Sequence, residues 1–525
     1  MKSTTFMPGL RTAALVLAGV ATMSMTTGAT AALTPLADQP ISIADVPANV
    51  MLALSVEFPT AITRAHQDDG DTFVTTKKYL GYFDPNKCYT YNGSYFEPAG
   101  FAGSNYTCAN QWSGNFMNWA TMQGVDTFRW VLTGGLRLTD EPKTFASASG
   151  SPLGKTVLQR AYASAQGTQG SYLTSNFPDR FLDKSLVKSY TGLPVDFHDR
   201  PLWIRNGGMG VQVRFGYEAE GKAPWSKNAE TSIEQTQVAV YNVNVEVCRD
   251  QGAGAGSFLE SNCRKYVDSA GTKTVWKPAG LMQQYKDKMY FGAFGYLYLT
   301  ENTASNIARD GGVLRAQIQS LDNEITETGA FLDDPYGMQA KQQVNSGTIN
   351  YLNKFGQSSG KYKRFDPVSE MYAEAVKYFK AMTPTASYIA GVDATLRDGF
   401  PVFTEWNDPA KDAKYPTQGA LSCKKNYIIG IGDTNSNYDR NLSGSNAPAP
   451  RASASCEATG TAQISRAGLR WRRLCSAAAM VAPVARPSST TMTMRLATSS
   501  GGRIGVYCAR RWWISCSCRR FSVAM

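Results

Sequence analysis

Four oxygen-bearing side chains alternate along one polar segment, at the spacing of the first ligands in a calcium loop: Asp433, Asn435, Asn437 and Asp439. In such a loop, carboxylate and amide oxygens at positions 1, 3, 5 and 7 surround a hard cation. The sixth position, which needs glycine for a sharp turn, is Tyr438 here, and the twelfth, which needs a bidentate glutamate, is Gly444. The pattern therefore favours a solvated loop without a cofactor, with calcium binding as the alternative.

The sequence contains two histidines, His66 and His198, and the second is followed directly by an acid, Asp199. A histidine oriented by an acid can serve a hydrolase as general base, but no serine stands in a G-x-S-x-G elbow. Walker, dinucleotide-binding and H-E-x-x-H motifs do not occur in the sequence either. We therefore predict a protein without enzymatic activity, and a secreted hydrolase that uses His198 is the alternative.

Residues 1–31 have the order of a secretory signal peptide. Lys2 and Arg11 precede an apolar run at 13–25, and small residues suited to cleavage follow at 29–31. The run is shorter than the roughly 20 apolar residues that span a bilayer, and a membrane anchor is the alternative. We predict that the mature chain is exported.

Export allows the cysteines of the mature chain to form disulfides. Cys88 lies close to Cys108 in the sequence, and Cys248 lies close to Cys263. A disulfide within each pair would restrict the unfolded chain and stabilise the fold by about 3 kcal/mol. Neither spacing is the C-x2-C of a zinc site. Cys423 is then left without a partner.

Three segments are predicted as strands: residues 49–58, 287–299 and 423–437. The first is apolar on both faces, which indicates a buried strand, and the third is predicted as another buried strand that ends in a polar loop. Helices are expected over 349–355 and 366–382. Strands of this kind usually form parallel sheets covered by helices. The order of strands and helices therefore predicts an α/β fold with a covered sheet.

A helix is also expected over 111–135, where apolar residues recur at steps of three and four: Trp119, Met122, Val125, Phe128 and Leu132. Ser113 or Asn115 can cap its start, and Gly134 can end it. The region 136–280 is predicted to be an insertion with antiparallel strands at 210–216 and 237–248, where apolar residues alternate.

The positive charge of the chain is confined to its end. Of its 53 basic and 42 acidic residues, twelve arginines and one glutamate lie in 451–525, which leaves 41 of each in 1–450. This balance gives the body of the protein no electrostatic basis for binding nucleic acid. Residues 446–525 are rich in arginine and cysteine without sustained periodicity, as a GC-rich gene read out of frame would be. We interpret them as a frameshifted or disordered basic tail, and a genuine basic tail that binds nucleic acid is the alternative.

Several segments, in order, resemble the N-terminal half of PilY/PilC-type proteins: NVMLALSVEFPTA, YLGYFDPNKCYTY, QWSGNFMNWATMQGVDTFRWVLTGG, LESNC, DKMYFGAFGYL, DGGVLRA, PVSEMYAEAVKYF and CKKNYIIGIGDTN. Members of this family are adhesins and assembly factors associated with the tips of type IV pili. The resemblance covers residues 40–445 and implies that 32–445 form a von Willebrand factor A-like domain with large insertions.

The resemblance also implies where the protein acts and what it binds. It predicts an exported protein of the periplasm, outer membrane and pilus tip of a Gram-negative bacterium. Its expected partners are minor pilins, the outer-membrane pilus machinery, and a host or abiotic surface. It is expected to act by binding in pilus assembly, twitching motility and attachment.

Two departures from the family pattern stand out. Many relatives carry a D-x-S-x-S metal-binding motif after the first strand, where this sequence reads SVEFPT, and Asp366 stands where a threonine is expected. Of the acidic ligands only Asp433 remains, so the resemblance predicts that this metal site is lost. Family members also continue into a β-propeller, which nothing after residue 445 resembles. This difference predicts a truncated chain, in which the partner of Cys423 belongs to the missing continuation.

Overall fold

The structure is a computed structural model of residues 1–525. It describes residues 46–66, 72–150, 153–163, 179–206, 210–219, 221, 224, 238–250, 258–298, 309, 311–357, 362–363, 365–411, 424–433, 439, 441–442 and 504–508. The expected signal peptide, Cys423 and all of the segment 446–525 except residues 504–508 lie outside this set.

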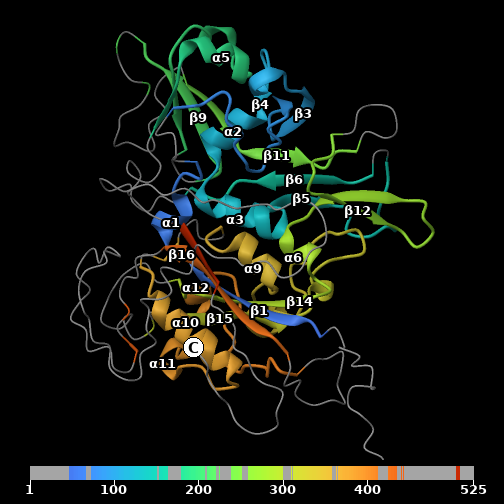
Figure 1. Ribbon diagram of the computed structural model, residues 1–525, viewed down its shortest axis with the longest axis vertical. Helices are drawn as coiled ribbons and strands as arrows, with labels where there is room; N and C mark the ends of the chain where they lie inside the picture. Colours follow the sequence, from blue (N-terminus) through green and yellow to red (C-terminus); the bar gives the residue numbers. More distant parts are fainter. Residues whose placement is uncertain are drawn as a thin grey trace, which may run out of the picture. The chain divides into compact units, whose positions relative to one another are not determined.

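A five-stranded sheet is built around β1 (Ala48–Ser55), in the order β15–β14–β1–β16–β17 (Figure 1). Its other strands are β14 (Met289–Gly295), β15 (Val313–Gln319), β16 (Asn426–Asp433) and β17 (Ile504–Cys508). β1 runs parallel to β14 and to β16, whereas β15 and β17 are antiparallel to their neighbours. The parallel strands predicted from the three apolar segments are thus confirmed. For β17, which belongs to the predicted tail, only the backbone is described.

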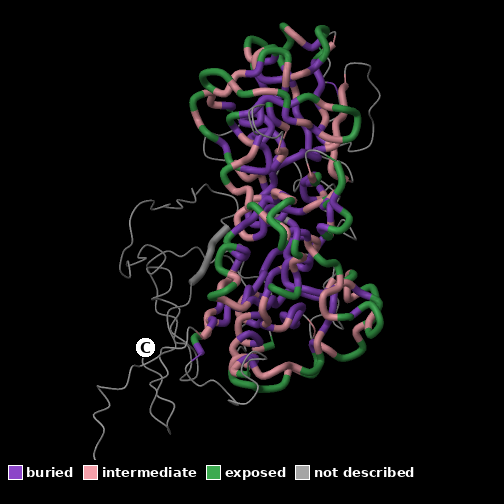
Figure 2. Tube along the Cα trace, turned by 90° about the vertical axis from the view of Figure 1, so that its right-hand side faces the viewer, coloured by how far each residue is buried: buried purple, intermediate pink, exposed green. Residues whose placement is uncertain are grey.

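Alternate residues of β1 are buried in two different cores, because successive side chains point to opposite faces of a sheet. Val50, Leu52 and Leu54 belong to a core that we name the β1 core, together with Ile349 and Leu352 of α9 (Thr348–Lys354). Met51 and Ala53 pack on the other face, with residues of α10 (Val368–Phe379). Covering both faces explains why β1 is apolar from residue 50 to residue 54. Figure 2 shows buried stretches along the middle of the described trace and exposed residues at many of its outer turns.

Two further sheets and a hairpin contain the remaining described strands. A six-stranded sheet has the order β4–β2–β3–β11–β6–β5, and a four-stranded sheet has the order β10–β9–β8–β7. The strands of the first are β2 (Lys87–Tyr91), β3 (Phe96–Phe101), β4 (Trp112–Ser113), β5 (Arg137–Glu141), β6 (Lys155–Gln159) and β11 (Asn244–Val247). Those of the second are β7 (Arg180–Leu182), β8 (Leu202–Arg205), β9 (Gln212–Tyr217) and β10 (Val238–Asn242), and the hairpin joins β12 (Cys263–Val267) to β13 (Thr274–Pro278).

The six- and four-stranded sheets contribute to a second core, which we name the aromatic core. Among its buried members are Phe83, Phe96, Trp112, Trp119 and Phe215. All described pairs in these two sheets are antiparallel except that of β3 with β11. The described fold is therefore mixed α/β with several antiparallel sheets, as the α/β assignment and the antiparallel strands of the insertion anticipated.

The prediction of a single helix over 111–135 is wrong, because the segment folds as β4 and two helices, α2 (Gly114–Thr121) and α3 (Gly124–Thr133). Gln123 interrupts the helix: its extended backbone begins α3, and its N–H donates to the carboxylate of Asp126 over 3.0 Å. The apolar stripe is divided accordingly. Trp119 and Met122 lie in the aromatic core, whereas Val125 and Phe128 lie in the β1 core. The predicted caps are confirmed, since Ser113 caps α2 and Gly134 ends α3 in the left-handed region.

The strand expected over 237–248 is also two strands, β10 and β11, in different sheets. Val243 separates them: its N–H donates to the carbonyl of Val211, and its own carbonyl accepts from the N–H of Arg160. The chain therefore passes from one sheet to the other within a continuous alternating pattern. Periodicity alone does not reveal such a change of partner.

The remaining described helices are short. They are α1 (Phe58–Ile62), α5 (Lys184–Tyr190), α6 (Leu281–Gln284), α8 (Met338–Gln342), α11 (Ala386–Ile389) and α12 (Ala394–Arg397), with 3-10 turns at Ser104–Tyr106, Val195–Phe197 and Leu321–Asn323. Within the described part of the chain, every helix falls short of the length and apolar character that a membrane span requires.

Candidate binding site

Of the four residues predicted as cation ligands, two are described. Asp433 ends β16, and only its backbone is described, whereas Asn435 and Asn437 lie outside the described residues. The carboxylate of Asp439 accepts hydrogen bonds from the backbone N–H groups of Ser369 (3.3 Å) and Glu370 (3.1 Å). These are N–H groups of the first turn of α10, where a negative charge is favourable. Asp439 thus caps α10, and calcium binding by this loop stays a prediction.

A cluster of charged side chains surrounds the carboxyl end of β1, where the resemblance predicts the loss of a metal site. The hydroxyl groups of Ser55 and Tyr296 lie 2.7 Å apart. Burial raises the pKa of the Tyr296 hydroxyl, and nearby carboxylates raise it further: Asp366, Asp439 and Glu57. The ammonium of Lys363 lies 4.8 Å from the centre of the Tyr296 ring. Lys363 therefore supplies positive charge near these acids.

Both cysteine pairs considered from the sequence are joined in the structure. Cys88 is bonded to Cys108 with their Cα atoms 5.5 Å apart, and Cys248 is bonded to Cys263 with theirs 5.6 Å apart. The second disulfide lies beside Glu260, whose carboxylate accepts from the N–H of Cys248 over 2.6 Å and lies 3.1 Å from the sulfur of Cys263. Because both sulfurs are bonded to each other, they are not available as thiolate ligands for a metal.

The two histidines lie on different segments, and each imidazole contacts a backbone carbonyl. The Nε2 of His198 lies 3.1 Å from the carbonyl oxygen of Leu193, and that of His66 lies 2.8 Å from the carbonyl oxygen of Leu80. These hydrogen bonds fix the rings against the backbone. No described hydrogen bond joins His198 to a serine or to Asp199.

A cavity of about 420 Å³ opens among segments that are distant in the sequence. Its lining combines the loop 78–86, Trp130 of α3, Leu158 of β6, Val247 of β11, the segment 259–262 and Pro278 at the end of β13. A cavity of this size can hold a small ligand. It is the candidate binding site of the described residues, and we name it the 78–86 cavity.

Two buried asparagines of α2 hold the loop 78–86 in place. Asn115 accepts from the N–H of Tyr79 over 2.7 Å and donates to the carbonyl of Lys77 over 2.8 Å. Asn118 accepts from the N–H of Phe83 (3.1 Å) and donates to its carbonyl (2.8 Å) and to that of Tyr79 (2.9 Å). The side-chain amides thereby replace backbone partners for a loop that has no strand neighbour. One wall of the cavity is rigid for this reason.

A buried ion pair joins this loop to the opposite wall. The ammonium of Lys87 lies 2.6 Å from the carboxylate of Glu260 and 3.6 Å from that of Asp84, and it donates to the carbonyl of Phe258 over 2.5 Å. Burial raises the pKa of the Glu260 carboxyl, against which the charge of Lys87 acts. Each wall is also attached to one disulfide, since Cys88 follows the loop and Cys263 follows Asn262. The site is therefore preorganised.

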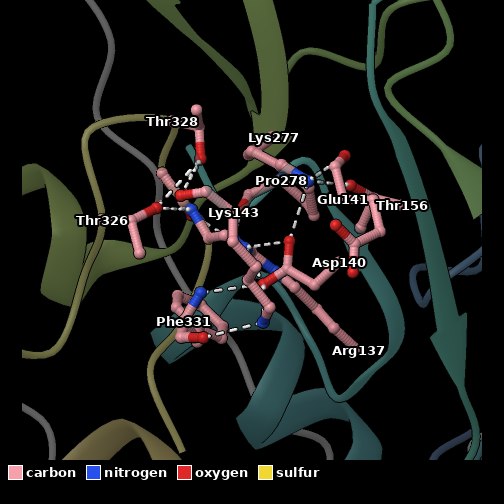
Figure 3. Close-up of polar contacts among 12 residues, drawn as sticks. Arg137, Asp140, Glu141, Lys143, Thr156, Lys277, Pro278, Thr326, Thr328 and Phe331 are labelled. Atoms are coloured by element: carbon pink, nitrogen blue, oxygen red, sulfur yellow. Dashed lines mark hydrogen bonds and ion pairs between the residues drawn. The ribbon is translucent and has the colours of Figure 1, made fainter. Parts of the chain in front are cut away.

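Pro278, at the end of β13, lines a third side of the cavity. It is held by a buried network around Asp140 (Figure 3). Arg137 donates to both oxygens of Asp140 over 3.0 Å and to the carbonyl of Pro278 over 2.7 Å. The ammonium of Lys277 lies 2.8 Å from Asp140 and donates to the carbonyl of Glu141 over 2.7 Å. These contacts hold the end of β13 against β5.

The network lowers the pKa of both Asp140 and Lys277, but for different reasons. Burial alone would raise the pKa of Asp140, but the charges of Arg137 and Lys277 outweigh it and lower that pKa. Burial lowers the pKa of Lys277 to about 8, and the neighbouring charges of Arg137 and Lys143 act in the same direction, against the pull of Asp140. The three cations stabilise the charge of the single carboxylate, whereas burial and the repulsion of the other two cations destabilise the charge of Lys277.

Sequence reasoning missed the 78–86 cavity. Its residues come from six separate segments and show no periodicity of their own. The available signals were the Asp84-Pro85-Asn86 turn and its position next to Cys88. These signals mark a constrained loop, but they do not indicate which segments face it.

Two stretches of the chain match known protein families. Residues 70–177 match a family described as "PilY1 homolog, small alpha/beta domain", and residues 304–472 match "PilY1 homolog, second domain". The first match includes the loop 78–86 and Trp130, and the second extends past residue 446, where the tail was predicted to begin. No solved structure matches the chain.

Two proteins of Xylella fastidiosa strain Temecula1 are similar in sequence, and each is named "Type IV pilus biogenesis factor PilY1 homolog". One is 34% identical over 451 residues, covering 76% of this chain and 33% of the relative. The other is 27% identical over 411 residues, covering 70% of this chain and 26% of the relative. The chain thus matches about a third or less of the length of these relatives. Two domain matches in order, together with these relatives, support the assignment of this chain to the PilY1-type family.

Proposed function

We propose that this protein acts in type IV pilus biogenesis by binding other proteins, without enzymatic activity. The observation that carries the proposal is the 34% identity to a protein named as a pilus biogenesis factor, over 76% of this chain. The preorganised cavity and the disulfide-joined loops support a role in binding, because rigid surfaces lose little conformational entropy when a partner docks. The carbonyl-bound imidazole of His198 also favours a structural role for that residue.

The proposal extends to the location and partners of the protein. It is exported to the cell envelope, where it contacts minor pilins and the outer-membrane pilus machinery, and as a tip adhesin it promotes twitching motility and attachment to host or abiotic surfaces. Two disulfides among the described residues support export, because such bonds persist mainly in oxidising compartments. The neutral charge balance of residues 1–450 supports protein partners rather than nucleic acid.

We further propose that the five-stranded sheet is von Willebrand factor A-like. The strand order β15–β14–β1–β16 supports this, with three central parallel strands and an antiparallel β15 joined to β14. Helices α9 and α10 belong to the cores on opposite faces of β1. In open sheets of this kind, partners usually meet the loops at the carboxyl ends of the parallel strands.

Genetic complementation tests the proposed function. The gene is deleted in its host and restored either intact or with an early stop codon. We expect sheared surface pili, twitching and surface attachment to fall in the deletion strain and to return only with the intact gene. Wild-type piliation, twitching and attachment in the deletion strain would contradict the proposal. Loss of attachment and twitching alone, with normal piliation, would remove the assembly role and leave the adhesin role.

A further inference from the structure

The charged groups at the 78–86 cavity limit which ligands it can bind. The carboxylates of Asp84 and Glu260 both face the ammonium of Lys87. Asp84 also accepts from the N–H of Asn86 over 2.9 Å, and Glu260 accepts from that of Cys248. Lys78 is exposed and adds a second cation. Two cations and two carboxylates therefore leave the site with no net formal charge.

The charge balance and the polar lining of the cavity argue against three classes of ligand: anions, divalent cations and lipid tails. An anion such as phosphate requires a surplus of basic groups or the N-terminus of a helix, and the cavity offers neither. A divalent cation requires several free oxygen ligands, whereas the carboxylates here are occupied by Lys87 and by backbone N–H groups. A lipid tail would need a lining without amide and hydroxyl groups, which Asn86, Ser261 and Asn262 supply.

The remaining groups are those that bind a neutral polyol. Trp130 lines the cavity and is half-buried, and none of the described contacts uses its indole N–H. The side-chain amide of Asn262 likewise makes no hydrogen bond to a described residue, and Ser261 is exposed beside it. An indole face packs against the apolar C–H face of a pyranose ring, while amide groups can both donate to and accept from its hydroxyls.

We propose that the 78–86 cavity binds a neutral hexose unit, stacked on Trp130 and hydrogen-bonded by Asn262 and the neighbouring polar groups. The volume of about 420 Å³ admits one or two such rings. The asparagine-held loop and the two disulfides keep the walls in place before the sugar arrives, which lowers the entropic cost of binding. This inference is independent of the role in pilus biogenesis, because it concerns only the chain and its ligand.

Calorimetric titration of the purified, oxidised full chain with methyl glycosides of glucose, galactose, mannose and N-acetylglucosamine tests the proposal. For ligands of this size we expect a dissociation constant of about 1 mM for the preferred sugar. Trp130→Ala should weaken binding about tenfold, and Asn262→Ala about fivefold. Trp203→Ala and Asn323→Ala are matched controls, since these residues do not line the cavity, and they should leave affinity unchanged.

Each outcome decides the question. A folded chain that binds none of the sugars overturns the proposal, and so does binding that both Trp130→Ala and Asn262→Ala leave unchanged. If Trp130→Ala does not fold, Asn262→Ala and the conservative Trp130→Phe take its place, with losses of about fivefold and twofold expected. Short neutral peptides are titrated in parallel. Peptide binding that depends on Trp130, without sugar binding, would assign the cavity to a protein partner instead.

Discussion

Asp140 is a buried anion that contacts three cations. Its carboxylate contacts Arg137 at 3.0 Å, Lys277 at 2.8 Å and Lys143 at 4.0 Å, and the side chain of Lys277 is fully buried. It also accepts from the N–H of Phe331 over 2.8 Å. Removing the single anion would leave buried cations without a counter-charge, which costs far more than losing an exposed ion pair.

Asp140→Asn should therefore lower the free energy of unfolding by about 3–5 kcal/mol, measured by urea titration. Lys277→Met should cost less, because it removes one of three cations and leaves Asp140 paired with Arg137. Asp287→Asn is the matched control: this carboxylate is largely exposed, and its loss should change stability by less than about 0.5 kcal/mol. Equal effects of Asp140→Asn and Asp287→Asn would show that the network does not contribute.

The lowered pKa of Asp140 predicts how this stability depends on acid. Its folded pKa lies below the ordinary 3.8, so the ionic contribution is complete above that pH and is lost as the pH falls through the folded pKa. The difference in unfolding free energy between wild type and Asp140→Asn should be constant from pH 5 to 7 and narrow below about pH 4. A difference that widens in acid would be inconsistent with an ionised Asp140.

The lowered pKa of Lys277 predicts how the stability depends on alkaline pH. The folded protein releases this proton near pH 8 and the unfolded chain near 10.5, so stability should rise with pH between these values. Relative to Lys277→Met, the wild type should gain up to about 3 kcal/mol across this window. Melting temperatures of the two proteins from pH 7.5 to 10.5 provide the measurement. Parallel pH profiles would show that Lys277 titrates normally.

At the scale of elements, α2 positions the loop 78–86 through two side chains rather than through a sheet. Asn118 is fully buried and serves three backbone groups of Tyr79 and Phe83. Gly81 lies against the same asparagine, and a Cβ there would come within 2.5 Å of its side-chain oxygen. The loop and helix are therefore closely packed.

Asn118→Ala should destabilise the protein by about 2–4 kcal/mol, because it leaves several buried backbone groups without partners. It should also raise hydrogen exchange in the loop, since the walls of the cavity are no longer held. Asn323→Ala is the control, because Asn323 is exposed and its side chain makes no described hydrogen bond. Unchanged exchange at residues 79–83 in Asn118→Ala would mean that the loop is held by other contacts.

At the scale of the whole molecule, α3 connects the aromatic core and the β1 core. Val125 and Phe128 are buried in the β1 core, and Trp130 packs against the aromatic core. Arg129, also fully buried, donates to the carbonyls of Leu352 (3.1 Å) and Phe355 (2.8 Å) at the end of α9. The two cores are thus joined by apolar packing and by a buried guanidinium.

Arg129→Met should lower the urea midpoint, with a loss of about 2–4 kcal/mol, since two carbonyls lose their donor. The unfolding curves from near-UV and far-UV circular dichroism should also separate, because the cores are less strongly coupled. Arg249→Met is the matched control, since Arg249 is one-third exposed and makes only 3.6 Å ion pairs. Coincident curves at the wild-type midpoint would contradict this role for α3.

Local pattern in the sequence was sufficient for features that depend on neighbouring residues. The continuous apolar run of β1 indicated a strand buried on both faces in a parallel sheet, because strands covered by helices on both faces have this pattern. Ser113 and Gly134 indicated the ends of helices, because capping involves groups within one turn. The close spacing of Cys88 and Cys108 likewise identified a pair that the fold joins.

Only the tertiary structure decided which core each apolar residue enters and which distant segments form the cavity. The stripe from Trp119 to Phe128 carries a helical period, but that period records burial without naming a partner, and the break at Gln123 sends its halves to different cores. Asp140 and Lys277 are 137 positions apart, and their pairing appears in no local pattern. The sequence by itself determined what must be buried and where elements begin. The site was determined by long-range contacts, because these depend on the packing of the whole chain.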